Sequence, residues 1–174
     1  KQERQQVQML FQAQESTFQL GYESGSQSAL VNHLQEDLKR INFGDQGDIM
    51  HVGMALTEAI TNAVDHGNLE LSSALREQPD NAYRELGKQR MNEPPYRERR
   101  VQVTTRITAD DATFVISDEG PGFDPSELPD PTDPENLLKA SGRGMRRIRT
   151  VMDDVAFASK GNEITMTKRR QALT

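Results

Sequence analysis

The chain has 174 residues, a formal net charge of −6 and a hydrophobic content of 34%. This length fits one domain with attachments, and the acidic balance argues against nucleic acid as the main partner, because phosphate binding requires a basic surface. The chain contains no cysteine, which excludes disulfides and thiolate metal sites. It shows no run of ~18 apolar residues that would span a membrane and no leader pattern, so we expect a cytoplasmic protein without a membrane segment.

The first elements expected in chain order are a helix, a strand and a second helix. Residues 1–16 are Gln-rich and helix-compatible, which predicts a linker helix from an upstream regulatory domain of a longer protein. Residues 17–22 alternate apolar and polar side chains, as an edge strand does. Residues 26–41 have four apolar side chains at helical spacing, namely Leu30, Leu34, Leu38 and Ile41.

A third helix is predicted from about Asp48, its capping residue, to about His66. At roughly 100° per residue, its apolar side chains share one face, and Glu58, Asn62 and Asp65 fall together on the opposite face. The helix contains no Lys or Arg, although the chain has 21. An ordinary solvated face usually mixes charges of both signs.

The second half of the chain is dominated by predicted strands. Residues 69–100 are hydrophilic, and residues 124–140 combine four prolines with five acidic residues. A short helix is predicted from Gly144 to about Met152. We expect two hairpins, formed by residues 101–107 with 112–117 and by residues 154–159 with 163–168. Helices first and strands late predict an α+β fold, a two-layer sandwich in which helices cover one face of a mostly antiparallel sheet.

Glu58 and Asn62 are separated by one helical turn, so their side chains stand one above the other. An amide oxygen suits magnesium, which prefers oxygen ligands and keeps several waters. A neighbouring carboxylate can accept a proton from a hydroxyl or water. Taken alone, the pair is also compatible with a plain solvated helix face.

Two glycine-containing segments follow the same pattern of a weak signal with an ordinary alternative. Asp118 ends an apolar strand and precedes Gly120 and Gly122. Its carboxylate can accept a hydrogen bond from the N6 amine of adenine. Alternatively, the segment is a common strand-ending turn. Gly142 and Gly144 precede a helix, and the free N–H groups at a helix start favour phosphate binding. Alternatively, the two glycines form a flexible hinge before the helix. No Walker P-loop or dinucleotide fingerprint is present.

The order and spacing of these three segments resemble the ATP site of the GHKL (Bergerat) family, which includes gyrase, heat-shock chaperone ATPases, histidine kinases and MutL. The resemblance covers residues 17–169 and is closest to the bacterial anti-sigma-factor serine/threonine kinases. It implies the sandwich fold, a histidine-kinase-like ATP-binding domain at residues 17–174, and ATP with Mg²⁺ as ligands. Residues 69–100 are an insertion that the compact family version does not require.

The resemblance also implies roles for individual residues. Glu58 would be the general base and Asn62 the magnesium ligand, whereas Asp65 would touch the nucleotide through water. Asp118 would hold adenine, with Gly120 and Gly122 shaping the pocket floor. Residues 124–140 would form the ATP lid, and the following residues would close over the phosphates: Ser141, Gly142, Arg143, Gly144 and Met145. Glu163 stands where the family often has a Thr that contacts adenine.

From this resemblance we expect a protein serine/threonine kinase that phosphorylates an anti-sigma-factor antagonist in a partner-switching pathway and also holds a sigma factor. One alternative is an ATP-regulated protein-binding module without phosphoryl transfer. Another is the catalytic domain of a sensor histidine kinase, although His33 lacks the basic residue and Pro that follow an acceptor histidine. The sequence leaves open whether the protein forms a homodimer.

Overall fold

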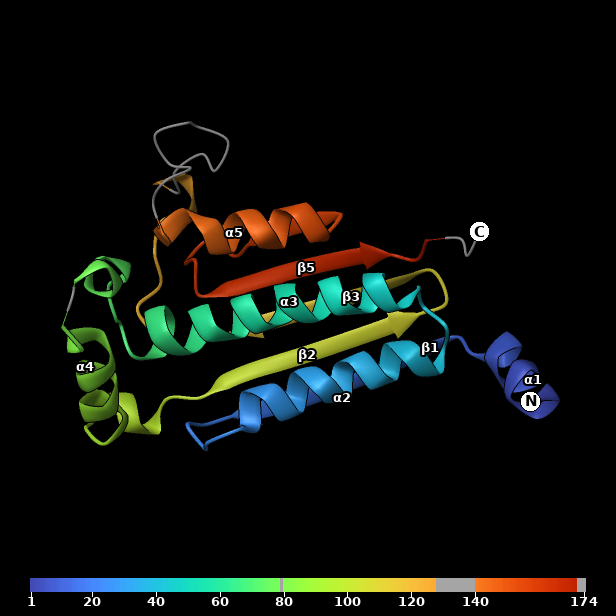
Figure 1. The fold of residues 1–174 in the computed structure, drawn as a ribbon, viewed down its shortest axis with the longest axis horizontal. Coiled ribbons are helices and arrows are strands. Elements are labelled where there is room, and N and C mark those ends of the chain that lie inside the picture. Colours follow the sequence, from blue (N-terminus) through green and yellow to red (C-terminus); the bar gives the residue numbers. More distant parts are fainter. Residues whose placement is uncertain (79, 128–139, 172–174) are drawn as a thin grey trace.

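The computed structural model of the protein describes residues 1–78, 80–127 and 140–171. Its centre is a five-stranded antiparallel sheet with strand order β1-β2-β3-β5-β4. Three helices, α2, α3 and α5, lie over the same face of this sheet (Figure 1). The predicted α+β two-layer sandwich is therefore confirmed.

The elements follow the predicted order. The strands are β1 (Ala13–Leu20), β2 (Val101–Thr108), β3 (Asp111–Ser117), β4 (Asp154–Phe157) and β5 (Glu163–Arg169). The helices are α1 (Gln2–Leu10), α2 (Ser26–Arg40), α3 (Gln46–Asn62), α4 (Ala82–Met91) and α5 (Ala140–Val151). A π-helical turn, η1 (Ala63–Asn68), continues α3, and three short 3₁₀ helices are η2 (Ser73–Glu77), η3 (Tyr96–Glu98) and η4 (Pro125–Glu127). None of the helices in the described ranges combines the length and apolar character needed to span a bilayer.

The core lies between the sheet and the three covering helices. Buried side chains alternate with more accessible ones along β2 and β3, as they must when only one face of a sheet is covered. The buried side chains of β3 and β5 meet helix residues spaced three or four positions apart on α2 and α3. The fully buried members include Leu34, Leu38, Leu56, Ile60, Phe114 and Met166.

The N-cap of helix α3 lies three residues earlier than the sequence indicated. Asp45 is its N-cap and accepts a hydrogen bond from the backbone N–H of Asp48, while the Asp48 carboxylate accepts one from the Asp45 N–H. This reciprocal capping box satisfies two backbone donors that an α-helix otherwise leaves unpaired. Asp48 therefore belongs to the cap, but as its partner and not as the capping residue itself.

Two further boundaries differ from the prediction. The first helix ends at Leu10, and residues 13–16 lie in β1, where Ala13 pairs with Thr108 of β2. Helix α5 begins at Ala140 instead of Gly144. Glycine disfavours a helix interior by roughly 0.5–1 kcal/mol, but Gly144 is buried against α3, where a Cβ atom would collide with Glu58. Close packing of two helices explains this glycine better than a helix start does.

Replacing Ile60 by Ala should destabilise the domain, because Ile60 is fully buried on the face of α3 that packs onto the sheet. We expect the free energy of unfolding to fall by about 2–5 kcal/mol in a urea titration, the usual cost of such a cavity. Met54→Ala is the matched control, because Met54 lies on the same helix and is 50% exposed. A similar loss in both variants would contradict the assigned faces of α3.

Candidate functional site

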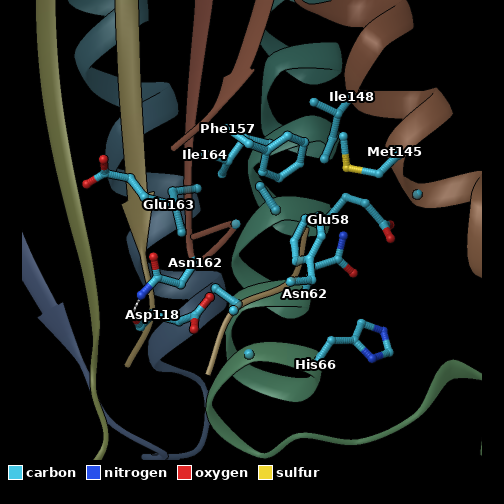
Figure 2. A pocket seen from close by; sticks show the side chains of 18 of the residues that line it. Glu58, Asn62, His66, Asp118, Met145, Ile148, Phe157, Asn162, Glu163 and Ile164 are labelled. Carbon is cyan, nitrogen blue, oxygen red and sulfur yellow. Dashed lines mark hydrogen bonds between the residues drawn. The ribbon is translucent and has the colours of Figure 1, made fainter. Parts of the chain in front are cut away.

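A pocket of about 340 Å³ opens between α3, α5, β3 and the turn that joins β4 to β5. Figure 2 shows its side chains converging from these separate elements. Its polar lining residues are Glu58, Asn62, His66, Ser73, Arg76, Asp118, Asn162 and Glu163. Its apolar lining includes Ile116, Phe123, Met145, Ile148, Phe157 and Ile164. Pockets with mostly apolar walls and a few convergent polar groups are typical ligand sites.

Glu58 and Asn62 both line this pocket, as their spacing predicted. Gly144 of α5 packs directly against the Glu58 carboxylate, and the Arg147 guanidinium lies 3.5 Å from Glu58 Oε2. The Glu58 side chain remains 21% exposed. The start of α5 therefore covers Glu58 without removing it from solvent.

Asp118 lies at the end of β3 and points into the pocket (Figure 2). Burial raises the pKa of this carboxyl to about 6, although the Gly120 N–H, which donates to Asp118 Oδ1 at 2.9 Å, and the charge of Arg99 both oppose the shift. The Asp118 backbone N–H donates to the Asn162 carbonyl at 2.9 Å, which ties β3 to the β4–β5 turn. A partly buried carboxylate with a raised pKa is the kind of group expected at a functional site.

The carboxylates of Glu58 and Asp118 lie at different heights along α3 and its π-helical continuation η1. Asp118 packs against Gly67, and Gly67 follows Glu58 by nine residues in α3 and η1. Nine residues make roughly two helical turns, so the two carboxylates are separated along the helix axis. Figure 2 shows Asn62 between them. The pocket is therefore elongated, with Asp118 at one end and Glu58 beside α5 at the other.

The wall between these ends suits a flat aromatic group. Ile116 and Ile164 contribute from the sheet, and Met145 and Ile148 from α5. Phe123 and Phe157 form an edge-to-face pair with ring centroids 5.3 Å apart. Apolar walls stabilise a planar base by burial, and Asp118 supplies a polar acceptor for its edge.

Two glycines join the pocket floor to the β4–β5 turn. Gly122 and Gly161 both have positive φ angles, 76° and 72°. A Cβ on Gly122 would collide with the Lys160 carbonyl, and one on Gly161 would collide with the Phe123 carbonyl. The Phe123 N–H donates to the same Lys160 carbonyl at 2.9 Å. The two loops therefore meet backbone to backbone.

The structure brings most of the predicted site residues together. The pocket is lined by Glu58, Asn62, Asp118, Gly122, Gly144 and Met145. Gly120 lies next to the pocket and holds Asp118, whereas Arg143 is exposed and does not line it. Ser141 and Gly142 belong to the first turn of α5. Of the expected lid, residues 128–139 lie outside the described residues.

Asp65 does not line the pocket, although the sequence placed it on the face of Glu58 and Asn62. The backbone changes from α to π geometry at Ala63, and the Leu69 N–H donates to the Val64 carbonyl five residues earlier. A π-turn holds more residues than an α-turn, so the side chains after Asn62 rotate away from the α-helical register. Asp65 points instead at Tyr83 and Arg76 of the insertion.

Sequence reasoning missed several lining residues. His66 lies at the end of the predicted third helix, and Phe157 and Asn162 lie in the predicted second hairpin, but none was assigned to the site. Glu163 was noted only as a departure from the family pattern. Glu163 accepts a hydrogen bond from Ser117 Oγ at 2.7 Å at this edge of the pocket. Ser73 and Arg76 come from the insertion, and no local pattern marked them. Only the three-dimensional position of η2 reveals them.

The fold and this pocket define a nucleotide-binding α+β sandwich. The chain matches the family model of the histidine kinase-like ATPase domain over residues 25–168. It therefore belongs to this family, and the predicted GHKL resemblance is confirmed at the level of an ATP-binding domain. No curated protein matches the chain.

The lining residues fit ATP. The apolar walls and Asp118 suit adenine. The Glu58 carboxylate lies against α5 and the Asn62 amide lies one turn along α3, so phosphates would extend toward this end of the pocket. Within the described residues, no three His, Asp or Glu side chains gather to hold a metal ion. Mg²⁺ in nucleotide sites commonly takes one or two protein oxygens and completes its shell with phosphates and water, so a single Asn62 oxygen is compatible with it.

Asp118→Asn should stabilise the free protein at pH 8 but not at pH 4. The carboxyl keeps its proton up to about pH 6 when folded and only to about 3.8 when unfolded, so stability falls as pH rises between these values. The neutral Asn amide does not ionise, so the variant does not lose stability as the pH rises, and its amide oxygen can still accept a hydrogen bond from the Gly120 N–H. We expect a gain on the order of 1–2 kcal/mol at pH 8, discounted for partial solvation.

Urea titrations at pH 4 and pH 8 measure this difference. Asp124→Asn is the control, because the Asp124 carboxylate is exposed and its hydrogen bonds from Ser126 hold its pKa below the usual value. That variant should show no gain at pH 8. An equal effect of Asp118→Asn at both pH values would contradict the raised pKa.

Proposed function

We propose that this ATP-binding domain is an Mg²⁺-dependent protein serine/threonine kinase of the anti-sigma-factor type. Its substrate would be an anti-sigma-factor antagonist, and its second partner would be a sigma factor. The observation that carries the proposal is that Glu58 and Asn62 line one pocket with Asp118. This arrangement would provide a base and a magnesium ligand at the end of the pocket away from the adenine acceptor.

The proposed chemistry divides between these side chains. Asn62 would hold Mg²⁺, which neutralises charge on the phosphates when it is bound. Glu58 would accept the proton of a serine or threonine hydroxyl as that oxygen attacks the γ-phosphorus. The bond between the γ-phosphorus and the β–γ bridging oxygen would break, and ADP would leave with the electron pair. A positioned base of this kind contributes roughly 10²–10⁴ in rate.

A specific surface feature favours the alternative of an ATP-regulated binding module. Met50 and Met54 stand one turn apart on α3 and are 54% and 50% exposed. Methionines adapt their shape to different partners and are common on binding surfaces. A partner protein could therefore dock on α3 without receiving a phosphoryl group. The sensor histidine kinase alternative differs in its product, a phosphohistidine.

The two helix residues should separate binding from turnover. Asn62→Ala should weaken Mg·ATP binding strongly, because it removes the proposed metal ligand, whereas Glu58→Gln should leave binding nearly intact and stop phosphoryl transfer. Calorimetry gives the affinities, and transfer from γ-labelled ATP to candidate antagonist proteins gives the turnover. Equal loss of binding in both variants would contradict the assignment of Glu58 as the base.

The phosphorylated product distinguishes the three functions. Acid-stable phosphoserine or phosphothreonine on the partner supports the proposed kinase, whereas acid-labile phosphohistidine supports the sensor kinase. Tight partner binding that depends on ATP but yields no phosphoprotein supports the binding module. His33→Gln provides a control for phosphorylation of the domain itself, because His33 is a partly exposed helix residue remote in sequence from Glu58.

Asp118 should make the site prefer ATP over GTP. A carboxylate accepts from the N6 amine of adenine, whereas guanine presents an oxygen at that position and would repel it. We expect a preference of at least about 1–3 kcal/mol, the cost of leaving a buried polar group unpaired, and Asp118→Ala should reduce it. Competition against a fluorescent ATP analogue at pH 8 measures both. GTP that competes as well as ATP would contradict the role of Asp118.

A further inference from the structure

The insertion of residues 69–100 forms part of the pocket. Its 3₁₀ helix η2 contributes Ser73 and Arg76 to the lining and is in contact with α5. In Figure 1, the green segment that contains η2 lies near the end of α5 where that helix begins. η2 therefore lies beside α5, the helix whose Gly144 packs on Glu58, and brings Arg76 into the pocket lining.

Arg76 is held in place by two residues that do not line the pocket. Its Nη2 donates to Asp65 Oδ2 at 3.3 Å, and its guanidinium stacks over the Tyr83 ring, 4.7 Å from the centroid. The Tyr83 hydroxyl donates to the same Asp65 oxygen at 2.8 Å. Burial and, to a smaller extent, the hydrogen bond to Asp65 raise the pKa of Tyr83 to about 12. The Tyr83 hydroxyl therefore remains a hydrogen-bond donor at neutral pH. The Arg76 side chain is nevertheless 41% exposed.

Arg76 is the positive charge in a pocket lined, in its described part, mainly by negative ones. The described lining carries three carboxylates, on Glu58, Asp118 and Glu163, and Arg76 is the only Lys or Arg in it. Arg147 reaches Glu58 but does not line the pocket. An anionic triphosphate entering such a site meets repulsion unless a cation opposes it. A guanidinium is suited to phosphate, because its planar donors can bind two oxygens at once.

We propose that Arg76 binds the phosphates of the nucleotide, and that Asp65 and Tyr83 are positioning residues that orient its guanidinium. This deepens the proposed function, because it assigns the insertion to the same ATP site. Asp65 would then act on the nucleotide through Arg76, instead of through water as the sequence suggested.

The test compares Arg76→Gln with Arg84→Gln in the full chain. Arg84 is an exposed residue of α4 outside the pocket lining, so its variant makes the same change in net charge. Calorimetry at fixed salt would use three probes: Mg·ATP, Mg·ADP and adenosine. We expect Arg76→Gln to weaken Mg·ATP about tenfold or more, the scale of a charge-assisted hydrogen bond, and to leave adenosine unchanged.

Unchanged adenosine binding also shows that the variant is folded. Arg84→Gln should alter none of the three affinities, and Arg76→Lys should recover part of the ATP affinity. Wild-type affinity of Arg76→Gln for Mg·ATP would overturn the inference, as would an equal loss for ATP and adenosine. If the wild type transfers no phosphoryl group, but Arg76→Gln still weakens Mg·ATP binding and leaves adenosine binding unchanged, only the kinase function is overturned.

A double-mutant cycle tests the positioning residues. Tyr83→Phe keeps the ring under Arg76 but removes the hydrogen bond to Asp65. It should lower the ATP affinity about threefold in the wild-type background and have no effect on ATP affinity in the Arg76→Gln background. An equal effect of Tyr83→Phe in both backgrounds would show that it acts on stability alone, and would overturn its assigned role.

Discussion

The packing of α3 between the sheet and the pocket is the constraint on which the rest of the structure depends. One face of this helix carries Val52, Leu56 and Ile60 into the core, and the other carries Glu58 and Asn62 into the pocket. Hydrophobic burial thus fixes the rotation of the helix, and that rotation aims the two polar side chains. Stability and the geometry of the site are properties of the same helix.

The contact of α5 with α3 sets the width of the pocket beside Glu58. Gly144 allows the two backbones to approach until the Glu58 carboxylate touches α5. Met145 and Ile148 of the same helix then form part of the apolar wall of the pocket. The helix therefore supplies both an apolar wall and a close neighbour to the proposed base, and a movement of α5 would change both together.

The predictable parts of the site are those set by local geometry. Glu58 and Asn62 could be placed because the α-helical period is fixed, and Asp118 because it directly follows a strand of apolar character. Asp65 could not, because the π-turn after Asn62 has no clear sequence signature. Arg76 depends on how a whole insertion docks, which is a tertiary property. The strand order likewise depends on pairing between strands distant in the sequence, so no local pattern predicted it, whereas the hairpins could be recognised locally.

The backbone contact of Gly122 with the β4–β5 turn restricts how this domain can change during evolution. Gly122 and Gly161 lie on two loops far apart in the sequence, and each occupies a left-handed conformation facing the other loop's carbonyl. Any side chain at either position would meet both backbone strain and a collision. Because a change in one glycine relieves nothing at the other, compensating substitutions are not available. Variation should therefore accumulate in the outer surface of the insertion sooner than at this junction.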